Sequence, residues 1–140
     1  TLVAAHLNSA KLDDLGPALV DLSYSQAEEK VLAIAAKIEK ADTSDNLCAW
    51  AVYVRLSGPL QSLPLESAAY QSAKAEMQSH LAKCNDPRLV DTYNSNVGVR
   101  EAFALGAMAP DIVGTDLDGV DFKLSDYRGK VIFLDFWGHW

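Results

Sequence analysis

The first hundred residues of the chain carry apolar residues at the spacing of amphipathic helices. Leucines recur at this spacing over residues 12–24, but Gly16-Pro17 lies among them and predicts one or two short helices instead of a long one. Ser25 and Glu28 form a capping box that begins a helix over about 25–40. The apolar face of that helix contains Ala27, Val31, Ile34, Ala35 and Ile38. This pattern predicts a helical domain.

Two longer helices are expected next. The first begins near Thr43 or Ser44, and Ser57-Gly58-Pro59 is expected to end it, because glycine and proline are typical of helix C-termini. The second starts near Pro64 and ends near Cys84, since its apolar residues recur every four positions. These apolar residues are Leu65, Ala69, Ala73, Met77 and Leu81.

A shorter helix is expected after Asn85. Asp86 can cap it and Pro87 fits its first turn, while Asn94-Ser95-Asn96 is expected to end it. Residues 100–105 predict one more turn of helix. We therefore expect a helical domain over residues 1–104.

At Gly106 the pattern changes, which predicts a second domain over residues 105–140. Glycines become frequent and the helical period disappears. Asp118-Gly119 predicts a two-residue hairpin turn, with arms over residues 112–117 and 120–124. Residues 125–129 then predict a helical turn that ends at a glycine.

The last eleven residues differ again from the hairpin. Apolar side chains surround Asp135 over residues 131–137 without the alternation of a strand that has one wet face. This pattern is typical of a strand covered on both faces in the middle of a sheet. The sequence given ends at Trp140, so the neighbouring strands of such a sheet are expected outside it.

Charge and composition exclude several classes of function. Lys and Arg number 12 and Asp and Glu 19, so the net charge is −7. Without a Lys/Arg cluster, nucleic acid is not expected as a partner. No apolar run reaches the roughly 18 residues of a membrane helix, and no signal peptide is visible. The chain begins with Thr1 and not with Met, so the lack of a leader says little about compartment.

The order of motifs after Gly106 resembles the beginning of a thioredoxin-like domain of the TlpA/ResA type. The motifs are Gly106-x-x-Ala109-Pro110-Asp111-Ile112, Asp118-Gly119, Phe122-x-Leu124-Ser125-Asp126-Tyr127-Arg128-Gly129-Lys130 and Val131-Ile132-Phe133-Leu134-Asp135-Phe136-Trp137-x-x-Trp140. Members of this family are extracytoplasmic thiol-disulfide oxidoreductases. The resemblance implies a mainly α chain in which a helical domain precedes the hairpin and first buried strand of a truncated thioredoxin-like α/β fold.

The same resemblance implies that the chain is part of a longer protein, called the parent here, and it implies the chemistry of that parent. A Cys-x-x-Cys motif would follow Trp140, and the parent would reduce or exchange disulfides of proteins outside the cytoplasm, without a cofactor. The chain itself is expected to be inactive, because it lacks that motif. Peroxiredoxins share part of this motif order and give an alternative peroxidase parent. A further alternative is a helical protein-binding or dimerisation module attached to a redox domain.

Two residues of the last strand are candidates for the site of the parent. Asp135 matches the family's buried acid, which lies beneath the cysteine pair. A carboxylate that loses its hydration on burial is suited to accept the proton of the resolving thiol. Trp140 matches the aromatic residue that precedes the first redox cysteine. The structural alternatives are an Asp135 that reaches solvent and a Trp140 that is an exposed chain end. We expect the tail to pack on the helical domain, to pair with a second copy, or to bind a missing C-terminal piece.

The cysteines form no redox motif, since 35 residues lie between Cys48 and Cys84. Three interpretations stay open: a structural disulfide between two antiparallel helices, two separate buried thiols, or ligation of a metal with His80. The acidic residues around Asp118-Gly119 superficially suggest calcium, but they lack the loop length and terminal Glu of an EF-hand. We expect a solvated hairpin turn there and no metal.

Overall fold

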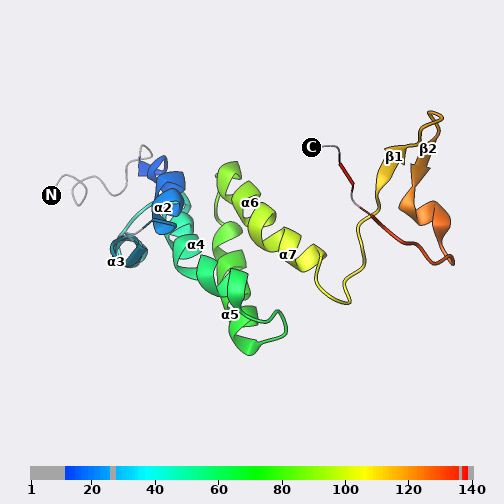
Figure 1. Ribbon diagram of the computed structural model, residues 1–140. Helices are drawn as coiled ribbons and strands as arrows, with labels where there is room; N and C mark the ends of the chain where they lie inside the picture. The colour runs from blue at the N-terminus through cyan, green and yellow to red at the C-terminus, as the bar shows by residue number, and fades with distance from the viewer. Residues whose placement is uncertain (1–11, 26–27, 136, 139–140) are drawn as a thin grey trace. The chain divides into compact units, whose positions relative to one another are not determined.

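The computed structural model describes residues 12–25, 28–135 and 137–138. The chain divides into two compact units, Thr1–Glu101 and Ala102–Trp140. The helices of the first unit are α2 (Leu15–Ser23), α3 (Glu28–Glu39), α4 (Asp45–Ser62), α5 (Ala68–Leu81), α6 (Pro87–Tyr93) and α7 (Val99–Ala102), whose last residue opens the second unit (Figure 1). The second unit contains strands β1 (Val113–Thr115) and β2 (Asp121–Lys123) and a short 3-10 helix, η3 (Leu124–Tyr127). The expectation of a mainly α chain with a short hairpin after the helices is confirmed.

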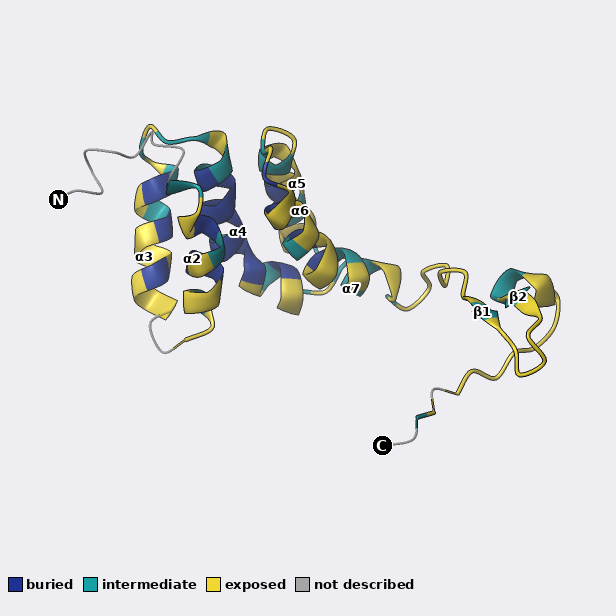
Figure 2. Cartoon of the chain, turned by 90° about the horizontal axis from the view of Figure 1, so that it is seen from above, coloured by how far each residue is buried: buried dark blue, intermediate teal, exposed yellow. Residues whose placement is uncertain are grey.

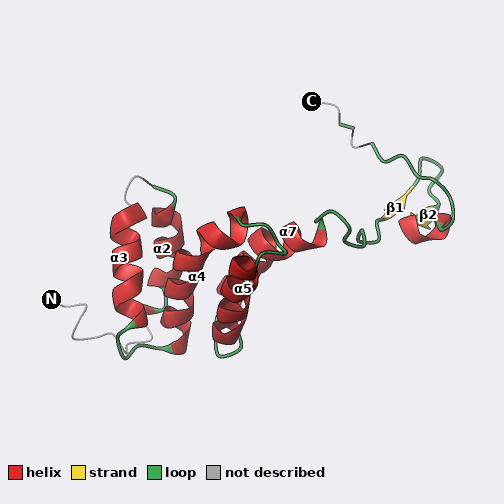
Figure 3. Cartoon of the chain, turned by 90° about the horizontal axis from the view of Figure 1, so that it is seen from below, coloured by secondary structure: helices red, strands yellow, loops and turns green. Residues whose placement is uncertain are grey.

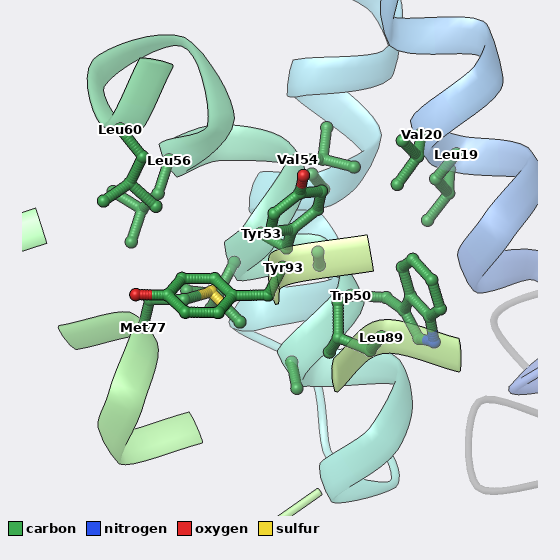
Figure 4. Packing of buried hydrophobic residues seen from close by; sticks show 14 of the residues in the cluster. Leu19, Val20, Trp50, Tyr53, Val54, Leu56, Leu60, Met77, Leu89 and Tyr93 are labelled. Carbon is green, nitrogen blue, oxygen red and sulfur yellow. The ribbon is translucent and has the colours of Figure 1, made fainter. Parts of the chain in front are cut away.

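Helix α4 is the centre of the helical unit. It packs against α2, α3 and α5, and most of its residues are buried (Figure 2). Large side chains from α4 meet those of the neighbouring helices in one hydrophobic core (Figure 4). The largest fully buried ones are Trp50, Tyr53, Tyr70, Leu47, Leu60, Met77, Leu89, Val52 and Val97. Burial of this apolar surface is the main stabilising term of the unit.

Within the described residues, three helices begin at capping residues. The sequence pattern identifies one of them, Asp86, and gives Ser44 with Thr43 as the alternative. The hydroxyl of Ser44 accepts the N–H of Leu47 at 3.1 Å, and the carboxylate of Asp86 accepts the N–H of Arg88 at 3.0 Å. Each cap satisfies an N–H that has no partner inside its helix. The third cap, Ser67, was missed, because Pro64 suggests an earlier start of α5.

The prediction that Ser57-Gly58-Pro59 ends the third helix is wrong. Helix α4 continues through Pro59 to Ser62. Proline removes one helical hydrogen bond, but it does not prevent a helix whose flanking face is buried. Leu56 and Leu60 are 6% and 0% exposed, so packing on both sides of Pro59 outweighs the lost hydrogen bond.

The α-helix α6 ends at Tyr93, directly before Asn94-Ser95-Asn96 as predicted, but the chain stays helical beyond it. A π-helical segment, η2 (Asn94–Gly98), joins α6 directly to α7. The side-chain amide of Asn96 donates to the hydroxyl of buried Tyr53 at 3.0 Å, so this residue has a partner that sequence spacing cannot reveal. Polar residues typical of a helix end are thus accommodated by a wider turn.

Charged side chains connect the helices at their edges. The guanidinium of Arg55 on α4 bonds Glu39 of α3 at 2.9 Å and Glu76 of α5 at 2.6 Å. Arg100 of α7 donates to the carbonyl oxygens of Leu60 and Leu63 at the end of α4. A cation at a helix C-terminus is favourable, because carbonyl groups there lack helical partners.

The second unit consists of the hairpin, η3 and a coil segment (Figure 3). Strand β1 pairs antiparallel with β2, with Gly114 opposite Phe122. The turn differs from the expected two-residue type. A two-residue type I′ turn needs positive φ at both central residues, whereas only Gly119 has it, at +80°. The N–H of Gly119 bonds the carbonyl of Asp116, which places Leu117 and Asp118 at the centre of the turn.

The expected buried strand over residues 131–137 is not formed within the described residues. Residues 131–135 have no strand pairing and are exposed. The physical reason is that a strand buried on both faces needs hydrogen-bonding neighbours and covering helices, and the described part of the unit supplies only the β1–β2 pair.

Candidate functional site

The candidate site is the segment that carries the thioredoxin-like motif order, residues 106–140. Asp111 joins two parts of this motif that are far apart in sequence. One of its carboxylate oxygens accepts the N–H of Ser125 at 2.8 Å and the other accepts the Ser125 hydroxyl at 2.7 Å. These two hydrogen bonds from Ser125 lower the pKa of Asp111. The Pro-Asp and Leu-Ser-Asp parts of the motif thus fix the start of η3 beside β1.

A second carboxylate, that of Asp126, holds the junction of β2 and η3. It accepts the N–H of Lys123 at 2.9 Å, in the manner of a capping box. The motif therefore places two aspartates, Asp111 and Asp126, as acceptors for backbone N–H groups. Sequence reasoning assigned neither of them this role. For Asp126 the signal available was its position beside Ser125 and three residues after the end of β2, which is typical of a capping residue. The bond between Asp111 and Ser125 spans 14 positions and has no local signal.

Aromatic side chains form the packed centre of this small unit. The rings of Phe122 and Tyr127 meet edge to face, with centroids 6.5 Å apart. Gly114 lies opposite Phe122, and a Cβ atom at that position would lie 3.4 Å from Phe122 Cζ. The ammonium of Lys130 lies 5.7 Å from the centre of the Tyr127 ring. These contacts hold the hairpin and η3 together without a larger core.

The tail presents an apolar surface to solvent. Val131 and Phe133 are 103% and 92% exposed, and Trp137 is 83% exposed. Asp135 is exposed as well, so the described residues do not supply the burial that its predicted role requires. Trp140 lies outside the described residues. Exposed apolar side chains that lie close together are uncommon on the surface of a monomeric protein.

The segment contains no thiol, and both cysteines lie in the helical unit. Cys48 Sγ of α4 is 3.9 Å from His80 Nδ1 of α5. Cys84 Sγ, just after α5, lies 3.4 Å from the backbone nitrogen of Asp86. Both cysteines are free and half-buried, with different neighbours. Burial raises the pKa of each thiol, which disfavours the thiolate that thiol-disulfide exchange requires.

Metal ligation has no support in the described ranges. Across residues 12–25, 28–135 and 137–138, no three His, Cys, Asp or Glu side chains are arranged to hold a metal ion. In the acidic hairpin turn, the carboxylate of Asp116 accepts the N–H groups of Asp118 and Val120 at 2.9 and 2.8 Å. Such a side-chain bond to the following backbone is typical of a solvated turn. None of the described helices is both long and apolar enough to span a bilayer.

Comparison with known proteins gives a consistent signal over part of the chain. A thiol-disulfide oxidoreductase ResA of Geobacillus kaustophilus is 58% identical over 41 residues, which are 29% of this chain and 24% of that protein. The ResA of Geobacillus thermodenitrificans is 54% identical over 41 residues. The matched part of the chain is similar to proteins of the TlpA/ResA type. We therefore call residues 106–140, which carry the family's motif order, the ResA-like segment.

The extent of these matches limits what they establish. The ResA of Bacillus subtilis is 42% identical over 48 residues, which are 34% of this chain and 27% of the relative. The chain thus spans about a quarter of the length of the curated relatives it matches. No protein-family model matches the chain. No solved structure matches it either.

Proposed function

We propose that the ResA-like segment is the N-terminal part of a thioredoxin-like domain in a thiol-disulfide oxidoreductase, and that residues 1–104 form a separate helical domain before it. The observation that carries this proposal is the dense similarity to ResA proteins, 58% identity over 41 residues. Support comes also from Asp111 and Ser125, which bond each other across the two motif parts. The activity of the parent would be reduction or exchange of protein disulfides outside the cytoplasm.

Within that parent, Asp135 and Trp140 have proposed roles. Asp135 would lie beneath the redox cysteine pair once the sheet is complete, where a buried carboxylate can accept the proton of the resolving thiol. Trp140 would precede the first redox cysteine and contact the partner protein. The exposed apolar side chains around Asp135 favour this proposal, because a complete thioredoxin-like sheet would cover them.

The 140-residue chain is proposed to be inactive by itself. It has two cysteines, Cys48 and Cys84, and no Cys-x-x-Cys motif. Both thiols are half-buried with raised pKa values, so neither is suited to attack a disulfide at neutral pH. A turbidity assay of insulin reduction by dithiothreitol tests this point. The chain and its Cys48→Ser/Cys84→Ser variant should both match the reaction without protein. Faster reduction by the chain than by the double variant would overturn the proposal of inactivity.

A second candidate function is a helical protein-binding or dimerisation module that positions a redox partner. The division of the chain into two compact units favours it, because the helical unit has its own core. Sizing of the 140-residue chain by light scattering addresses dimerisation. A mass of 15.2 kDa at all protein concentrations would remove the dimerisation form of this candidate.

A further inference from the structure

The helical unit contains a groove of about 430 Å³ that the proposed redox chemistry does not use. It is lined by the end of α2, the start of α3 and the C-terminal half of α4. These three helices pack against one another (Figure 2). Its apolar lining consists of Leu32, Val54, Pro59 and the ring of Tyr24. A groove of this size is large enough for one or two side chains of a polypeptide.

Among the residues that the structure describes, none explains the presence of Gly58 in this groove. It lies within α4 with an ordinary helical φ, so the backbone does not require glycine there. A Cβ atom at this position would meet nothing within 4 Å, so packing does not require it either. Glycine inside a helix lowers stability relative to alanine. A glycine at this position leaves the backbone of α4 uncovered, so a ligand can approach the helix closely, and this accounts for the glycine.

Two serine hydroxyls of the groove can act only as acceptors toward a ligand. The hydroxyl protons of Ser23 and Ser57 are already donated, to the carbonyl oxygens of Val20 and Val54 at 2.7 and 3.0 Å. Their oxygens can still accept a hydrogen bond. Pro59 has no N–H, so α4 lacks the helical hydrogen bond to the carbonyl of Arg55. A ligand that complements these groups must bring donors.

The charges of the groove point in the same direction. Glu28 is exposed on its rim, and the cation of the groove, Arg55, is bonded to both Glu39 and Glu76. An anionic ligand would compete with two carboxylates for Arg55, whereas a cation meets the carboxylate of Glu28. The net charge of the chain, −7, also favours a cationic ligand.

We propose that this groove binds a basic segment of a partner protein, with a Lys or Arg side chain at Glu28 and a neighbouring apolar side chain over Gly58. The apolar lining distinguishes such a segment from a small polyamine, which would use the charge alone. The proposal concerns the helical unit and does not depend on the activity of the ResA-like segment.

Fluorescence anisotropy with labelled peptides and the full 140-residue chain tests the proposal. The probe is a nonapeptide of alternating Lys and Leu, and the comparison peptides replace Lys by Glu or Leu by Gly. At low salt the Lys/Leu peptide should bind, and each comparison peptide should bind at least about tenfold more weakly. Equal binding of the Glu/Leu peptide would overturn the charge assignment. If spermine displaces the probe as effectively as unlabelled Lys/Leu peptide does, the proposed contact of an apolar side chain with the groove is overturned.

Variants of the chain locate the binding. Glu28→Lys should weaken binding of the Lys/Leu peptide at least about tenfold. The control is Glu66→Lys, which makes the same change of charge at an exposed acid outside the groove. It should retain more than half of the affinity. Gly58→Trp should abolish binding while circular dichroism shows an unchanged helical fold. If Gly58→Trp does not fold, the two Glu variants decide alone. Equal weakening by both Glu variants, or full binding by folded Gly58→Trp, would overturn the proposal.

Discussion

The indole N–H of Trp50 donates to the buried carboxylate of Asp86 at a distance of 3.0 Å. This bond joins the centre of α4 to the start of α6. Asp86 also pairs with the guanidinium of Arg88, whose nitrogen lies 2.8 Å from the carboxylate, and it caps α6 through the Arg88 N–H. A buried carboxylate with this many donors stays ionised at low pH, because each donor favours the charged form.

The pH dependence of stability should therefore report on Asp86. Hydrogen bonds lower the pKa of Asp86 from 3.8 to about 2. The largest effect comes from the Arg88 side chain, and the Trp50 N–H adds to it. Because the pKa is lower in the folded chain, ionised Asp86 stabilises the fold. This stabilisation is complete above pH 3.8 and disappears as pH falls toward 2. Since Arg88 is half exposed and solvent screens its charge, the loss should be about 1–2 kcal/mol in the free energy of unfolding.

Urea denaturation of the chain and of Asp86→Asn between pH 7 and pH 2 measures this contribution. Asparagine retains the helix cap but not the charge, so the variant should lose the stabilisation at pH 7 and converge on the original chain near pH 2. Asp91→Asn, an exposed acid on the same helix, is the control and should show no such convergence. A constant difference between the Asp86 variant and the original chain at all pH values would contradict the assignment.

Glycine substitutions at two helical positions should have opposite effects. Gly16 of α2 lies directly against the indole of Trp50, and a Cβ atom at this position would come within 2.5 Å of Trp50 Nε1. Gly16→Ala should therefore lower the free energy of unfolding by about 1–3 kcal/mol. Gly58→Ala should raise it by up to about 1 kcal/mol, because the added Cβ meets open space. Thermal melts of the two variants that shift in the same direction would contradict this packing.

Two buried tyrosines should respond differently to loss of the hydroxyl. Tyr93 is buried and its hydroxyl has no hydrogen-bond partner within the described ranges, whereas the hydroxyl of Tyr53 accepts the Asn96 amide at 3.0 Å. Tyr93→Phe should be neutral or stabilising, and Tyr53→Phe should be destabilising by about 1 kcal/mol. Chemical denaturation gives both values. A larger loss for Tyr93→Phe than for Tyr53→Phe would show that Tyr93 has a partner not identified by the structure.

The cysteines should titrate as two protected thiols. Because burial raises the pKa of both Cys48 and Cys84, Ellman's reagent at neutral pH should react slowly with the native chain and rapidly with two thiols after denaturation. Omission of reductant from the sample distinguishes free thiols from a bridge. Recovery of no thiol in denaturant would establish the disulfide that the sequence also permits.

A helix start with its own local chemistry was more predictable than a helix C-terminus. Asp86 followed by Pro87 identifies a helix start from sequence, because the cap and the first turn are neighbours in the chain. The continuation of α4 through Pro59 depends on burial of Leu56 and Leu60 by other helices, which residue type alone does not reveal. The Trp50–Asp86 bond likewise spans 36 positions and has no local signature.

For the ResA-like segment the motif order was informative and the geometry was less so. The hairpin was located from Asp118-Gly119, but the carboxylate of Asp116 selects a different turn by accepting two N–H groups. The apolar run around Asp135 predicts a buried strand, yet burial depends on neighbours and not on the run itself. Sequence pattern therefore identified the type of segment, but it did not predict the exposed conformation of residues 131–135.

A chimera tests the central claim most directly. Residues 1–140 are joined to the part of Geobacillus kaustophilus ResA that follows its matched segment, and the insulin-reduction rate is compared with that of the chain alone. The account predicts catalysis by the chimera and none by the chain, with a loss of about tenfold or more for Asp135→Ala in the chimera and little change for Asp118→Ala. A folded chimera that fails to reduce insulin would contradict the assignment of residues 106–140 to a thioredoxin-like oxidoreductase.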